Sequence, residues 1–187
     1  MVPRAGTSFA ICNAHVKEDE IHMKVFRSHL LLCGGTGCHA SGSLAVKKEL
    51  IAQLDMRGLS DEIKVVETGC NGFCAAGPIM VIYPEGTFYQ KVRMEDVPLI
   101  IEEHIIKGRP IERLMYREPR SERPIPHIKD IPFFGKQMLV ALRNRGLIDA
   151  EKIDEYIARD GYMAAAKVLT AMTPEQVIQE ITRAGLR

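Results

Sequence analysis

Four cysteines on two short glycine-containing loops are the residues of this sequence best suited to chemistry. The first loop reads C-G-G-T-G-C from Cys33 to Cys38, and the second reads C-N-G-F-C from Cys70 to Cys74. Cysteine sulfur is a ligand that soft metal centres prefer, including zinc and iron-sulfur clusters. We therefore predict that the four thiolates of the two loops bind one metal centre.

The composition of the loops favours a 2Fe-2S cluster over a single zinc ion. Both C-x4-C and C-x3-C fall within the range of structural zinc sites, so spacing alone leaves zinc open. The glycines between the cysteines allow backbone N–H groups to approach closely, and these groups would satisfy bridging sulfides, which a zinc ion lacks. A zinc site and a thiol redox site stay open as alternatives.

Other iron-sulfur and thiol motifs do not match the spacing. Bacterial 4Fe-4S sites repeat C-x2-C, and plant-type 2Fe-2S proteins follow C-x4-C with a C-x2-C step. Thiol-disulfide exchange uses C-x-x-C. None of these patterns occurs in the sequence.

Three further residues lie near the predicted ligands or resemble them. Cys12 stands alone outside both loops and is interpreted as an incidental thiol. His39 directly follows Cys38 and could tune the centre through a hydrogen bond, although simple exposure to solvent is the favoured interpretation. Phe73 lies between two predicted ligands, and we expect it to shield the centre from water.

The elements that must position the loops alternate between strands and helices, which predicts an α/β fold. Each loop follows an apolar run that is typical of a buried strand. Between them, the spacing of Val46, Leu50, Ile51 and Leu54 predicts a helix that ends near Gly58. After the second loop, we expect a hairpin and then a helix with Val97, Ile101 and Ile105 in the core. The predicted strands are 29–33, 63–68, 79–83 and 87–92, and the last helix ends near Gly108.

The segments on either side of this unit differ from it in composition and in predicted secondary structure. Residues 1–27 read as an irregular lead-in. Residues 109–132 hold five of the ten prolines, which predicts an extended linker over the surface. Beyond the linker, residues 133–187 read as a small all-helical segment with helices over 135–144, 150–159, 162–172 and 174–184. Thr173 and Gln176 form a predicted capping box at the start of the last helix.

Composition limits the partners and the compartment. The 187 residues carry a formal net charge of +1, which gives no reason to expect nucleic acid as a partner. No apolar run approaches the length of a signal peptide or of a membrane span, so we expect no direct membrane insertion. We therefore expect a soluble, cytoplasmic protein, and in a reducing compartment five cysteines fit metal ligands or reactive thiols better than a disulfide framework.

Residues 29–108 resemble the thioredoxin-like 2Fe-2S ferredoxins. The resemblance rests on the two cysteine spacings and on the order strand, helix, strand, hairpin, helix. That family includes the small cluster-bearing subunit of respiratory complex I and its relatives in multimeric hydrogenases. It implies a thioredoxin-like domain over residues 28–108, with Cys33, Cys38, Cys70 and Cys74 as the cluster ligands.

Residues 133–187 are similar to the start of the flavoprotein family of NADH-oxidising and diaphorase subunits. The motifs are Q-M-L-V-A-L-R-N-R-G-L-I-D from Gln137, Y-I-A-R-D-G-Y from Tyr156, T-P-E-Q-V-I from Thr173 and A-G-L-R from Ala184. In that family FMN, NAD(P)H and a 4Fe-4S cluster bind beyond the corresponding point. The resemblance therefore implies that those groups belong to a full-length subunit, and that this chain alone is not catalytic.

Taken together, these features predict an electron-transfer module. The chain would carry one electron at a time in an NAD(P)H-linked oxidoreductase or hydrogenase, beside other subunits of the complex and a redox protein partner. The alternative is a zinc-stabilised interaction module that assembles a larger complex.

Overall fold

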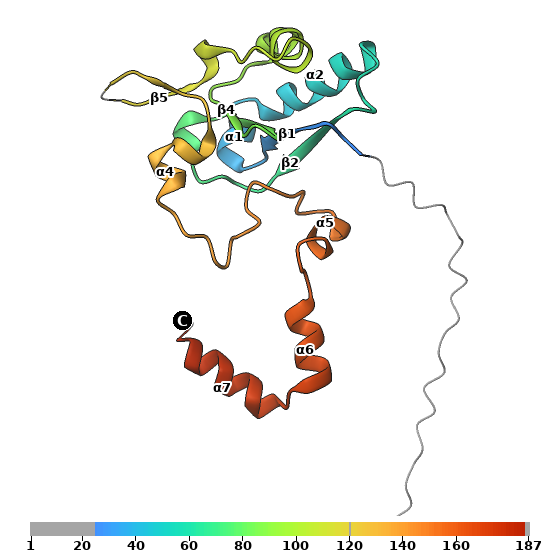
Figure 1. Cartoon of the computed structure of the whole chain (residues 1–187), viewed down its shortest axis with the longest axis vertical. Helices are drawn as coiled ribbons and strands as arrows, with labels where there is room; N and C mark the ends of the chain where they lie inside the picture. Colours follow the sequence, from blue (N-terminus) through green and yellow to red (C-terminus); the bar gives the residue numbers. More distant parts are fainter. Residues whose placement is uncertain (1–24, 120, 186–187) are drawn as a thin grey trace, which may run out of the picture.

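The computed structural model describes residues 25–119 and 121–185, so most of the lead-in, including Cys12, lies outside the described residues. A four-stranded sheet, in the order β2-β1-β3-β4, forms the centre of the fold (Figure 1). The strands are β1 (Ser28–Cys33), β2 (Ile63–Thr68), β3 (Met80–Tyr83) and β4 (Thr87–Tyr89). Three strand predictions are confirmed within a residue, whereas β4 stops three residues short of the predicted end.

The direction of β1 and β2 brings the two cysteine loops together. These strands are parallel, and Cys33 at the end of β1 is in register with Thr68 at the end of β2. Strand β3 pairs antiparallel with both β1 and β4. Because parallel strands end at the same edge of a sheet, both cysteine loops leave the sheet side by side.

Two helices cover one face of the sheet and form the larger core with it (Figure 1). They are α2 (Ser43–Met56) and the helix that runs from α3 (Val97–Leu99) into the π-helical η3 (Ile100–Ile106). The predicted core stripe of Val97, Ile101 and Ile105 is confirmed, since all three are buried. In α2, however, Ile51 is 44% exposed, because it lies beyond the edge of the buried stripe.

The proline-rich segment, which the sequence predicted to run over the surface, packs against both faces of the sheet. The segment buries Ile111, Leu114 and Met115 in the larger core, and it buries Ile131 on the opposite face of the sheet. Its backbone also extends the sheet, since Phe88 donates to Pro126 and Gln90 donates to Leu114. The prolines prevent one long helix, but they leave apolar side chains free to pack. The segment holds η4 (Glu112–Leu114), β5 (Tyr116–Arg117), β6 (Pro124–Ile125), η5 (Ile128–Asp130) and the start of α4 (Pro132–Gly135).

The C-terminal segment has short helices joined by a long run of turns. Helices α6 (Met163–Ala171) and α7 (Pro174–Ala184) match the prediction, and the capping box of Thr173 and Gln176 is present. Helix α5 (Ile153–Ile157) is shorter than predicted. The predicted helix over 135–144 is wrong, because the chain there turns across the second cysteine loop.

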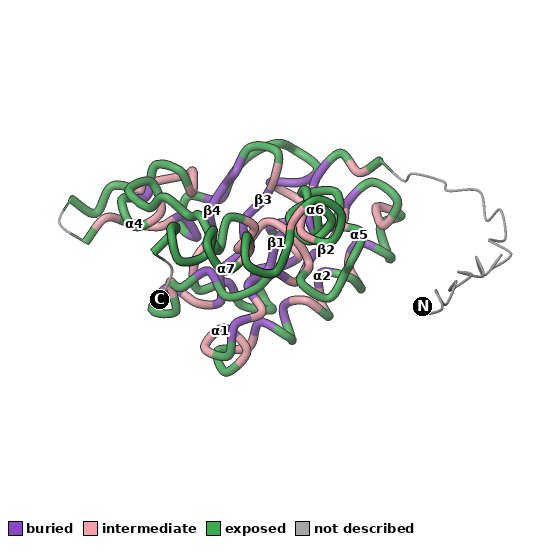
Figure 2. Tube along the Cα trace, turned by 90° about the horizontal axis from the view of Figure 1, so that it is seen from below, coloured by how far each residue is buried: buried purple, intermediate pink, exposed green. Residues whose placement is uncertain are grey.

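The last two helices extend away from the sheet and bury none of their residues (Figures 1 and 2). Within the part of the chain that the structure describes, no helix has the length and apolar character needed to cross a membrane.

Candidate metal centre

The first pair of cysteines is buried and held by regular structure. Cys33 is the last residue of β1, and Cys38 lies within α1 (Thr36–Ala40), a short helix that the sequence analysis did not predict. The two residues are only 2% and 1% exposed. Backbone hydrogen bonds from Cys33 to Ile79 and from Gly34 to Thr68 fix the start of the loop.

The second pair lies at the surface on irregular backbone. Cys70 follows β2 by two residues, and Cys74 begins the 3-10 turn η1 (Cys74–Ala76). Both residues are exposed. The Gly72 backbone N–H donates to the Cys70 sulfur over 3.3 Å, so this loop supplies the kind of donor that stabilises a thiolate ligand.

The two loops interlock, which places all four sulfurs in one region. A Cβ atom added at Gly35 of the first loop would lie 2.9 Å from the sulfur of Cys70. A Cβ atom at Gly77, just after the second loop, would lie 2.9 Å from the sulfur of Cys38. These glycines are therefore required for close approach, because any side chain at either position would collide with a sulfur of the other loop.

Mutual repulsion and burial oppose ionisation of the clustered thiols. Burial chiefly raises the pKa of Cys38 to about 11, and the nearby Cys33 thiol adds to the shift. The charge of Cys70 raises the pKa of Cys74, and Cys33 contributes as well. Thiolates so close together need a compensating cation, and a bound metal that deprotonates them would provide it.

Glu67 braces the first loop from β2, a role that the sequence analysis missed. Its carboxylate contacts the His39 ring nitrogen at 2.8 Å and accepts a hydrogen bond from Lys47 on α2 at 2.5 Å. The hydrogen bond from Lys47 is the main reason that the pKa of Glu67 lies below its usual value. His39 is therefore paired with Glu67 and is not simply exposed. No local motif could have revealed this contact, because its three members come from separate elements.

Aromatic rings and the C-terminal segment support the second loop. Phe73, predicted as a water shield, is half-buried and stacks on Phe133 with ring centroids 4.8 Å apart. It also packs against Phe88, Tyr116 and Phe134. Further along the chain, Gly146 lies directly against the Asn71 side chain. Phe133, just before the long run of turns, and Gly146, within it, thus fasten the run across the loop.

The donor set and its surroundings fit a 2Fe-2S centre. Within the described residues, no three or more His, Cys, Asp or Glu side chains are placed to hold a single metal ion. The thiols come instead as two pairs, one from each loop, with hydrogen-bond contact inside each pair. Each pair is a suitable ligand set for one iron of a two-iron cluster.

Comparison with known proteins gives the same assignment. The family description "Thioredoxin-like [2Fe-2S] ferredoxin" matches residues 22–104. The 2Fe-2S ferredoxin of Clostridium pasteurianum is 43% identical over 77 residues, which are 41% of this chain and 76% of the relative. The chain belongs to the thioredoxin-like [2Fe-2S] ferredoxin family. Its α/β fold and its electron-transfer character follow from that membership.

Two further similar proteins match the chain over very different shares of their own length. The NADP-reducing hydrogenase subunit HndC of Solidesulfovibrio fructosivorans is 56% identical over 52 residues, which are 28% of this chain but only 10% of that subunit. The crystal structure of the wild-type thioredoxin-like [2Fe-2S] ferredoxin from Aquifex aeolicus is 31% identical, with a TM-score of 0.44. It covers 48% of this chain and 96% of its own.

Proposed function

We propose that Cys33, Cys38, Cys70 and Cys74 hold a 2Fe-2S cluster that passes single electrons between subunits of an NAD(P)H-linked oxidoreductase or hydrogenase. The observation that carries this proposal is the interlocking of the two loops, with glycine at the two points where a side chain would collide with a sulfur. When bound, the cluster supplies one-electron oxidation and reduction.

The protein's own residues would set the properties of the site through position and charge. Cys33 and Cys38 provide a buried, rigid half that excludes water. The Gly72 N–H donates to Cys70 and lowers the electron density on that ligand. Glu67 holds His39, the residue that directly follows Cys38, in a fixed position.

Electrons would enter and leave on the side of the second loop. Cys70 and Cys74 are exposed, whereas Cys33 and Cys38 are covered by the fold. A redox partner that docks there would reach the cluster through two surface ligands. The C-terminal segment also crosses the second loop, at Asn71 and Phe73, so it lies on the same side as the proposed route for electrons.

The wider context that we propose is a diaphorase-type subunit. It is supported by the likeness to the HndC subunit and by the flavoprotein-like motifs of residues 133–187. FMN, NAD(P)H and a 4Fe-4S cluster would then belong to the full-length subunit and its complex. We also propose a cytoplasmic location, because in a reducing compartment these cysteines would serve as metal ligands and would not form disulfides.

Affinity purification of the tagged chain from its native cells tests this context. The expected result is co-purification of partner subunits, together with bleaching of the visible iron-sulfur absorption when NADH or NADPH is added. A tagged chain that keeps its cluster, purifies alone and is not reduced by either nucleotide in the presence of cell extract would contradict the NAD(P)H link, while leaving the cluster assignment intact.

A further inference from the structure

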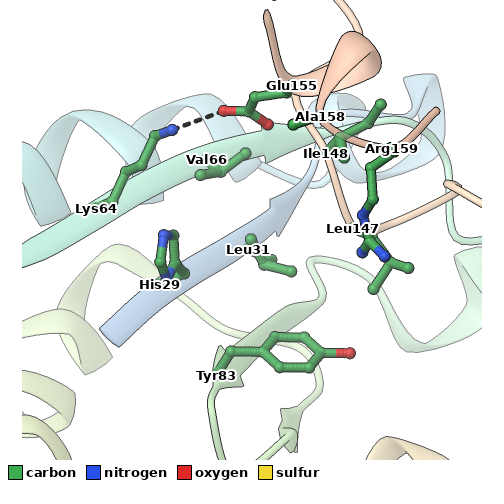
Figure 3. A pocket seen from close by; sticks show the side chains of 10 residues that line it. All are labelled: His29, Leu31, Lys64, Val66, Tyr83, Leu147, Ile148, Glu155, Ala158 and Arg159. Atoms are coloured by element: carbon green, nitrogen blue, oxygen red, sulfur yellow. Dashed lines mark hydrogen bonds and ion pairs between the residues drawn. The ribbon is translucent and has the colours of Figure 1, made fainter. Parts of the chain in front are cut away.

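A cavity of about 450 Å³ lies between the sheet and the C-terminal segment, and none of the four cysteines lines it (Figure 3). Its floor is the face of β1, β2 and β3 that the larger core does not use. Its roof comes from Leu147, Ile148 and the residues around α5. Sites for small molecules commonly have this volume and often form where two structural units meet.

The floor has a polar row and an apolar row. In the polar row, His29 of β1 is in register with Lys64 of β2 on one side and with Tyr83 of β3 on the other. In the next row on the same face, Leu31 is in register with Val66, and both are buried. The apolar pair gives a flat surface that suits a planar ring, and the polar row borders it.

One positive charge at the cavity has no acidic partner among the residues that the structure describes. Lys64 is paired with Glu155 of the roof at 2.6 Å, so these two charges cancel. Arg159 also lines the cavity, and among the described residues it forms no ion pair. Figure 3 shows its side chain beside Leu147, on the side to which the Tyr83 hydroxyl points. A ligand would therefore meet a guanidinium group above an apolar floor.

The two other polar groups are neutral and can form hydrogen bonds. Burial raises the pKa of Tyr83, so its hydroxyl stays protonated and can donate. Burial, followed by the charge of Lys64, lowers the pKa of His29. The imidazole is therefore neutral near pH 7 and offers one donor and one acceptor.

We propose that this cavity binds a small aromatic carboxylate, with its ring on Leu31 and Val66 and its carboxylate on Arg159. The planar guanidinium fork matches a carboxylate, and the Tyr83 hydroxyl can donate a further hydrogen bond. Leu31 and Cys33 lie on the same face of β1, two residues and about 7 Å apart. A ligand on Leu31 would therefore lie close to the first cysteine loop. The site is separate from the cysteine ligands and does not depend on the proposed redox partners.

Calorimetric titration of the cluster-containing full chain with 2-naphthoate tests the proposal. Saturable binding is expected, and the neutral analogue 2-naphthalenemethanol should bind about tenfold more weakly or worse, because a hydrogen bond to a charged group is lost. Arg159→Gln should weaken 2-naphthoate binding by a similar factor. Ala158→Phe, which fills the cavity from the roof, should abolish binding.

Arg183→Gln is the matched control, since Arg183 lies on α7 outside the cavity and the variant makes the same change in charge. It should bind 2-naphthoate like the unmodified protein. Visible absorption and circular dichroism check that each variant is folded. If Arg159→Gln does not fold, the neutral analogue and the Ala158→Phe variant still test the proposal. The proposal is overturned if 2-naphthoate does not saturate, if the alcohol binds equally well, or if Ala158→Phe binds as before.

Discussion

The two cysteine loops present the same ligand type in opposite surroundings. The first loop has its cysteines on a strand end and a helix, both at most 2% exposed, with Glu67 bracing it from β2. The second loop is irregular and exposed, and it is supported by Phe73, Phe133 and the crossing C-terminal segment. One loop is thus built into the core, and the other is clamped from outside.

This difference separates two tasks that an electron-transfer site must combine. A buried, rigid half keeps the geometry of a centre constant, and an exposed half gives a partner access. Segments with few buried contacts also open more easily than core elements. We therefore expect changes at the first loop to affect whether the centre forms, and changes at the second loop to affect its access and its exchange.

The largest expected contrast is between serine variants of the two pairs. Cys33→Ser should lose the centre, because a buried hydroxyl without a partner costs about 1–3 kcal/mol in addition to the lost sulfur ligand. Cys74→Ser should retain a centre with a changed spectrum, since water reaches this position and can satisfy the oxygen. Iron content and visible absorption of the purified variants measure the contrast. Equal loss of the metal centre in both variants would contradict the expected difference between the two loops.

Steric contact between the loops gives the next largest effect. Gly35→Ala should reduce the iron content strongly, because its Cβ would lie 2.9 Å from the sulfur of Cys70. Gly69→Ala is the matched control, since a Cβ there meets nothing within 4 Å although the residue adjoins Cys70. Iron per chain should stay unchanged in the control. If both variants lose iron equally, contact between the loops is not what the glycines provide.

Removal of the brace on the first loop should have a moderate effect. Glu67→Ala should lower the free energy of unfolding by about 1–2 kcal/mol, because two partly exposed charge contacts and their packing are lost. Since the pKa of Glu67 is lowered in the folded state, this stabilisation is present above about pH 4.5 and fades as the pH falls through the lowered value. Chemical unfolding at pH 7 measures the change.

Glu62→Ala is the matched control for that variant. Glu62 pairs with Arg27 at the surface, with both side chains about half exposed, and its removal should cost less than about 0.5 kcal/mol. Glu67→Gln should fall between the two, because the amide can still accept from Lys47. A Glu67→Ala variant no less stable than Glu62→Ala would show that the first loop needs no brace.

The smallest expected effect on the metal centre concerns the clamp on the second loop. Phe133→Ala should cost only about 1–2 kcal/mol of stability, since Phe133 is 38% exposed and the variant loses two ring contacts, one stacked on Phe73 and one edge-on to Phe134. Its main consequence should be faster proteolysis within the turns of residues 136–152, with little change in iron content. Unchanged cleavage there would mean that the stacked rings do not fasten the C-terminal segment.

The part of this architecture that could be predicted from sequence is the part encoded locally. Apolar runs before each loop located β1 and β2, and Thr173 with Gln176 located the start of α7. Contacts between distant segments gave no such signal. The brace formed by Glu67 joins three elements, and the buried side chains of the proline-rich segment depend on the two cores into which they pack.

The error over residues 135–144 has the same origin. The composition there permits a helix, but the neighbouring residues Phe133 and Gly146 contact the second loop. Crossing that loop requires turns, so tertiary contacts override local helix propensity. The same contacts support the second loop. Because they join residues far apart in the sequence, neither the turns nor the support of the loop could be predicted from the local sequence.

Metal and sulfide analysis, combined with electron paramagnetic resonance, tests the central claim most directly. If the four cysteines hold a 2Fe-2S cluster, the purified chain should contain two irons and two acid-labile sulfides, and dithionite should produce a rhombic signal from one unpaired spin. A colourless protein with one zinc, no labile sulfide and no such signal would contradict the account and would support the zinc-stabilised interaction module instead.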